Sequence, residues 1–153
     1  MGFLDKLKAN SQKYGQQLNT KKGQFKNKDF AQASMAMCAL IAAADGSIDA
    51  AERQKTTSVI TSNDILSIFH PDDLRENFNN YANKLEQDFS LGKVEAIRAI
   101  GKLKGKDDQA RAVIQIGIII GGADGNFDPD EQRAVRDACN AVGIAPAEFD
   151  LDV

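Results

Sequence analysis

Two short acidic segments hold the side chains best suited to chemistry in this chain. Residues 44–52 read Ala-Asp-Gly-Ser-Ile-Asp-Ala-Ala-Glu, and residues 123–131 read Ala-Asp-Gly-Asn-Phe-Asp-Pro-Asp-Glu. Both fit the pattern A-D-G-x-Φ-D-x-x-E, in which Φ is apolar, and every position of the second copy lies 79 residues after its equivalent, as Asp124 lies after Asp45. Oxygen donors at fixed spacing predict a surface that binds a hard cation or a basic partner.

The spacing matches the second half of a calcium-binding EF-hand loop. In the first copy Asp45 takes loop position 5, Ser47 supplies a backbone carbonyl at position 7, Asp49 takes position 9 and Glu52 the bidentate position 12. The same four positions in the second copy are Asp124, Asn126, Asp128 and Glu131. We therefore predict a divalent-cation site, with Ca²⁺ the first expectation and Mg²⁺ or Mn²⁺ as alternatives.

The first half of the EF-hand loop is missing from both copies. Positions 1 and 3 are Ile41 and Ala43 in one copy and Ile120 and Gly122 in the other, and none of these has a side-chain oxygen. Each loop alone leaves Ca²⁺ short of its usual six to eight ligands. Bound waters must complete each site, or the two loops must share ions.

Helix capping is the competing interpretation of these acidic residues. Asp49 with Glu52, and Asp128 with Glu131, stand at N-cap and N3 spacing, as in a capping box, and Pro129 occupies the favoured first helical position. Capping does not explain Asp45 or Asp124, which follow apolar helices, where the helix dipole disfavours negative charge. Both interpretations remain open at the level of sequence.

Length and composition favour one globular domain in a reducing compartment. The chain has 153 residues, 42% of them apolar and 27% charged, which is typical of folded proteins. We expect no signal peptide, because the N-terminal residues lack an apolar core followed by a small-residue cleavage site. The most apolar stretch, residues 112–123, is shorter than the roughly 20 residues that span a bilayer. We expect a cytoplasmic protein, with association at the inner face of the membrane as an option.

A basic N-terminal arm precedes an acidic body. Residues 1–28 contain seven Lys and one Asp, a net charge of +6, whereas the whole chain carries −3. We divide the chain into this arm and a helical domain at 29–153, and expect the arm to contact a protein partner or an anionic membrane surface. The arm has no Arg, the residue most used to read bases, so no nucleic-acid partner is expected. The lysines assigned to this contact are Lys6, Lys8, Lys13, Lys21 and Lys22.

Apolar residues recur every three or four positions along the chain, which predicts an all-α fold. The repeated unit is helix, acidic loop, helix, and two such units are expected to pack about a pseudo-twofold axis. Ser90 is the predicted N-cap of its helix, and Gly143 the left-handed C-cap of another. The predicted helical segments are 3–18, 29–44, 49 to beyond 59, 63–69, 72–87, 90–103, 110–123 with its start at Asp107 or Asp108, 129–142 and a final turn from Pro146 that buries Phe149.

No catalytic residue is predicted. Cys38 and Cys139 are far apart, without a CxxC pattern, and are expected in the core, while His70 precedes Pro71 as a polar residue at a helix end. No nucleophile has a recognisable base partner in the sequence. A non-enzymatic role is therefore expected.

The chain resembles the TerB family of tellurite-resistance proteins over almost its whole length. The resemblance rests on the two A-D-G-x-Φ-D-x-x-E loops, the start Phe3-Leu4-Asp5-Lys6, the segment Phe25-Lys26-Asn27-Lys28 and the ending 142–149, Val-Gly-Ile-Ala-Pro-Ala-Glu-Phe. It implies a compact bundle of about seven helices, an acidic metal-binding surface and a role in bacterial tellurite resistance and stress responses. It also implies partners of the TerC membrane-protein and TerD calcium-binding types.

Overall fold

In the computed structural model, residues 25–44, 48–121, 128–149 and 151 are described. This part of the chain is built from α-helices and two short 3-10 turns and holds no strand, which confirms the all-α prediction. The elements in chain order are α2 (Lys28–Ala42), α3 (Ala50–Ser62), η2 (Leu66–Ile68), α4 (Pro71–Gln87), α5 (Phe89–Gly101), α6 (Asp107–Gly121), α7 (Pro129–Val142) and η3 (Pro146–Phe149).

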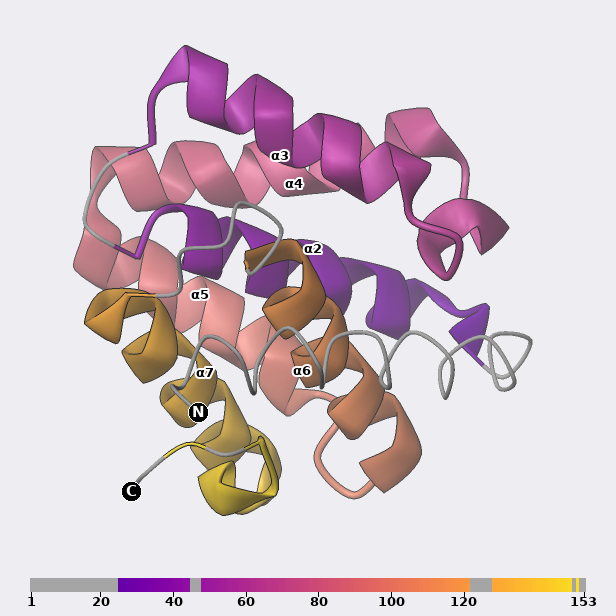
Figure 1. Ribbon diagram of the computed structural model, residues 1–153, viewed down its shortest axis with the longest axis vertical. Helices are drawn as coiled ribbons and strands as arrows, with labels where there is room; N and C mark the ends of the chain where they lie inside the picture. The colour runs from indigo at the N-terminus through magenta and orange to yellow at the C-terminus, as the bar shows by residue number, and fades with distance from the viewer. Residues whose placement is uncertain (1–24, 45–47, 122–127, 150, 152–153) are drawn as a thin grey trace, which may run out of the picture.

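Helix α2 is the centre of the bundle. It lies between α3 and α4 on one side and α5, α6 and α7 on the other (Figure 1). Its sequence explains this position, because residues 33–41 are all buried and apolar except Ser34, so the helix presents apolar side chains in every direction. Phe25, at the start of the described chain, is also buried and stacks on Phe30, with ring centroids 4.8 Å apart.

The long apolar segment predicted as a helix forms α6. It packs directly on α2, and Gly117 permits this, because a Cβ there would lie 2.7 Å from Cγ of Met37. Beta-branched side chains such as Ile114, Ile116 and Ile118 are buried in this helix. Burial in the core therefore outweighs their preference for strands.

Of the three predicted helix N-caps, those of α3 and α7 are present and that of α5 differs. The left-handed C-cap at Gly143 is confirmed, with φ of 75°, and His70 caps α4 by accepting a hydrogen bond from the Asp72 amide. The prediction of Ser90 as the cap of α5 is wrong. Asp88 takes this role, and its carboxylate accepts from the Leu91 amide at 3.2 Å. The N-cap thus lies two residues earlier than predicted, because Asp88 has the extended backbone and the side-chain oxygen that an N-cap requires.

The helix predicted at the N-terminus lies outside the described residues. Segment 3–18, with the arm residues Lys6, Lys8, Lys13, Lys21 and Lys22, falls in 1–24. The count of about seven helices and the pseudo-twofold relation of the two repeats therefore remain predictions. The order helix, loop, helix does occur twice, with α2 followed by α3 and α6 followed by α7.

Candidate functional site

The second half of the first acidic loop forms the N-terminus of α3. Asp49 has extended φ and ψ angles of −83° and 172°, and its Oδ1 accepts a hydrogen bond from the Glu52 amide at 2.7 Å. The predicted capping role of Asp49 is thereby confirmed. Asp49 is exposed, and the cap uses one of its two carboxylate oxygens.

The second acidic loop ends in a complete capping box at the start of α7. Asp128 Oδ1 accepts from the Glu131 amide at 2.8 Å, and Glu131 Oε1 accepts from the Asp128 amide at 3.4 Å. Pro129 stands at the first helical position, where no amide hydrogen is needed. Asp49 and Asp128 have nearly the same backbone angles, since Asp128 has φ of −78° and ψ of 172°.

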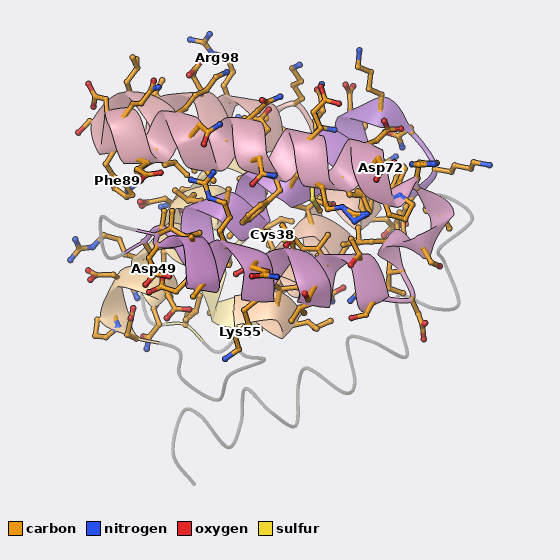
Figure 2. The ribbon with its side chains drawn as sticks, turned by 90° about the horizontal axis from the view of Figure 1, so that it is seen from above. Cys38, Asp49, Lys55, Asp72, Phe89 and Arg98 are labelled. Carbon is orange, nitrogen blue, oxygen red and sulfur yellow. The ribbon has the colours of Figure 1, made fainter. Side chains whose placement is uncertain are left out.

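The two capped starts lie at one end of the bundle. Figure 1 shows the C-terminal end of α2 and the N-terminal ends of α3 and α7 at the left of the molecule, and Asp49 is at this same end in Figure 2. Helix N-termini carry partial positive charge, which stabilises the carboxylates there. Asp130 and Glu131 add further carboxylates in the first turn of α7.

The remaining predicted ligands lie outside the described residues. These are Asp45 and Ser47 in segment 45–47, and Asp124 and Asn126 in segment 122–127. Among the residues that the structure does describe, no three His, Cys, Asp or Glu side chains gather as a metal-binding group. Asp49, Asp128 and Glu131 are accordingly placed as helix-capping residues, and the Glu52 amide donates to the Asp49 cap. A cation site that includes these four residues requires the loop donors.

An arginine next to the first acidic loop was missed at the level of sequence. Arg53 follows Glu52 and reaches across to α4, where its Nη1 donates to Asn83 at 2.6 Å and its Nη2 pairs with Glu86 at 2.8 Å. This pair lies in an open groove of about 430 Å³ between α3 and α4. The sequence offered one indication of this contact, which is that Arg53 stands one helical turn after the Asp49 cap.

Helix α3 is the least buried of the described helices. Ile60 is its one buried residue, so its attachment depends on Ile60 with the half-buried Val59, on the preceding Ile48 and on the Arg53 contacts. Its buried apolar area is therefore small, and we expect it to open more easily than the other described helices.

The two thiols are buried and protonated. Cys38 is 1% exposed and Cys139 is 0% exposed, which confirms their predicted core position. Burial raises the pKa of the Cys38 thiol far above its usual range, and burial together with the nearby Glu148 carboxylate raises the pKa of Cys139 to about 12. Neither thiol is poised as a nucleophile, because the thiolate is the reactive form.

Comparison with known proteins decides the family. The family model described as tellurite resistance protein TerB matches residues 31–152. The chain belongs to the TerB family. It is 31% identical over 118 residues to a protein of Alcaligenes sp. named tellurium resistance protein TerB, and this match covers 77% of the chain and 97% of that relative. No solved structure matches the chain. The TerB match spans both acidic loops. A separate finding is that no helix of the described residues is long and apolar enough to cross a bilayer.

Proposed function

We propose that this TerB protein is a non-enzymatic module of tellurite-resistance and stress responses in the cytoplasm, and that its two acidic loops bind divalent cations. The proposal rests on one observation, which is that two acidic helix starts of the same geometry lie at one end of the bundle. Family membership supports the connection to tellurite resistance.

The donor chemistry of these loops fits a hard cation. Each capping aspartate uses Oδ1 for the helix amide, so its second oxygen stays available to a ligand. The backbone carbonyls of Ser47 and Asn126 and the carboxylates of Asp45 and Asp124 would complete the oxygen set. Carboxylate, carbonyl and water oxygens are the ligands of Ca²⁺, and also of Mg²⁺ and Mn²⁺.

Binding at this end of the bundle would regulate the position of α3. The helix begins directly after the first loop and has little buried apolar surface, so a cation that fixes its N-terminus would favour the packed position. A partner protein would then bind the surface that α3 covers in one position and exposes in the other. Partners of the TerC membrane-protein or TerD type would fit a scaffolding role of this kind.

Calorimetric titration of chelator-treated protein tests the cation site. We expect saturable binding of Ca²⁺, and weaker binding of Mg²⁺, which dehydrates reluctantly and demands strict octahedral geometry. Mn²⁺ is titrated in parallel, and Zn²⁺ serves as a control, because its usual Cys and His ligands do not occur in the loops. Flat titrations with Ca²⁺, Mg²⁺ and Mn²⁺ would refute the proposal.

A metal-free adaptor is the second candidate, and the capping geometry favours it. The caps account for Asp49 and Asp128 without an ion. In this alternative the acidic end docks a basic partner, and the lysine-rich arm contacts an anionic membrane or another subunit. Replacing Lys6, Lys8 and Lys13 by Gln in the full chain should then abolish vesicle or partner binding without a change in unfolding midpoint, and binding that persists would rule out the arm as the tether.

A further inference from the structure

The α5 surface carries the most exposed large apolar side chains of the described residues. Leu91 is 60% exposed and Val94 is 54% exposed. They stand three residues apart, so they project from the same face of the helix. Beside them an open groove of about 660 Å³ runs between α5 and α7, with Phe89, Val94 and Ile97 among its lining residues. This face therefore leaves aliphatic surface in water at a measurable cost in free energy.

Basic side chains lie on the same face of α5, closer to its C-terminal end. Arg98 and Lys102 follow Val94 at successive intervals of four residues and are exposed, and so are Lys104 and Lys106 in the next turn. Residues 89–106 hold five basic residues and one acidic residue, a net charge of +4 in a chain of net charge −3. The region is thus opposite in charge to the rest of the body.

The ion pairs of the described residues leave these cations available. Lys93 pairs with Asp137 at 2.5 Å, and Glu95 pairs with Lys84 at 3.4 Å. No ion pair joins Arg98, Lys102, Lys104 or Lys106 to another part of the described chain. Asp107 and Asp108 come next in sequence, in the first turn of α6, and with them residues 89–108 still carry a net charge of +2.

Helix stabilisation explains only part of this arrangement. A basic residue near the C-terminus of a helix is stabilised by the dipole, which is sufficient for Arg98 in the last turn of α5 and for Lys102 at its C-cap. It gives no reason for Leu91 and Val94 to remain exposed at the other end of the same face. Aliphatic side chains that project beside unpaired cations are the combination that binds an anionic bilayer, because the former enter the interface and the latter face the lipid headgroups.

We propose that the α5 surface, formed by Leu91, Val94, Arg98 and Lys102 with Lys104 and Lys106, docks on an anionic lipid bilayer. This surface is distinct from the basic arm and from the acidic loop end, so the contact does not depend on the cation site. Figure 2 shows Arg98 and Lys55 at opposite edges of the molecule, so the docked protein would hold α3 away from the lipid.

Sedimentation with vesicles tests the proposal on the full chain. The vesicles are phosphatidylcholine alone, or equimolar phosphatidylcholine and phosphatidylglycerol, in buffer with a chelator so that the acidic loops play no part. We expect binding to the anionic vesicles only. Leu91→Ser with Val94→Ser should lower the partition coefficient by roughly tenfold or more, because two aliphatic side chains are lost from the interface.

A charge-matched pair of variants separates this face from overall electrostatics. Arg98→Gln with Lys102→Gln should also lower the partition coefficient, by roughly 25-fold, since each cation near an anionic surface contributes about fivefold. Lys55→Gln with Arg75→Gln removes the same charge from the α3–α4 side and should change it by less than about threefold, because distant charges are screened. Equal losses in both pairs would overturn the proposal.

A fluorescent label reports the contact at a chosen position of the surface. Cys38 and Cys139 are buried, so an introduced cysteine is labelled selectively. An environment-sensitive dye on Val94→Cys should shift to shorter wavelength on anionic vesicles, whereas the same dye on Lys55→Cys should not. Absence of a shift at position 94 while the protein sediments would assign the membrane contact to the arm, and absence of sedimentation would leave this face to a protein partner; either result overturns lipid docking by α5.

Discussion

The two roles of the acidic loop residues can be separated at Asp128. Its Oδ1 accepts from the Glu131 amide, and its charge lies in the first turn of α7, so alanine removes a cap and a favourable dipole interaction together. Loss of a cap costs about 1 kcal/mol and loss of the charge about 0.3–1 kcal/mol. Asp128→Ala should therefore destabilise the fold by about 1–2 kcal/mol, whereas Asp128→Asn keeps the cap and should cost less than about 1 kcal/mol.

The assay is urea or thermal unfolding in the presence of a chelator, followed by far-ultraviolet circular dichroism because the chain has no Trp. For a chain of this length, 1 kcal/mol corresponds to a shift of about 2–4 °C in Tm. Asp130→Ala is the matched control, since Asp130 is exposed in the same turn but is not the N-cap. If Asp128→Asn is as unstable as Asp128→Ala, the hydrogen bond is not the stabilising interaction and the capping interpretation fails.

Two further predictions concern the core. Gly92→Ala should lower the free energy of unfolding in a urea titration, because its Cβ would lie 2.7 Å from Cα of Leu85. Overpacking of this kind costs about 1–3 kcal/mol, which exceeds the roughly 1 kcal/mol that alanine gains in helix propensity. Gly101→Ala is the control, and it should be neutral or stabilising because the nearest atom would lie 3.9 Å from its Cβ. The free energy of unfolding should also fall as pH rises from 9.0 to about 12, because the buried thiols Cys38 and Cys139 ionise near 9.0 when unfolded but resist ionisation in the fold. Cys139→Ala should make this decline less steep in unfolding curves measured at successive pH values, and an unchanged slope would contradict the buried, protonated Cys139 thiol.

Local chemistry made much of the fold predictable. The period of apolar residues gave the helices, and the Asp-x-x-Glu spacing gave the starts of α3 and α7, because capping depends on residues three positions apart. Gly143 was identified as a left-handed C-cap from its place after an amphipathic segment. Asp88 was missed because Asp and Ser both cap helices well, and the choice between them depends on backbone conformation rather than residue type.

Tertiary contacts were beyond the reach of the sequence. The pairing of Arg53 with Glu86 joins residues 33 positions apart on different helices, and no periodicity predicts it. The exposure of Leu91 and Val94 is a similar case, because a helix with apolar residues on several faces does not reveal which face its neighbours leave uncovered. The ligand set of the acidic loops is predicted from residue spacing, and titration with metal ions in solution tests it.

Calcium titration of paired variants tests the central claim most directly. Chelator-treated wild type should release or absorb heat in a saturable titration, and Asp45→Asn with Asp124→Asn should abolish it. Asp64→Asn with Asp73→Asn, which removes two exposed carboxylates elsewhere, should leave it unchanged. Calcium binding of the same affinity in all three proteins, or no binding in any, would contradict the account and leave the acidic loops with capping and partner docking alone.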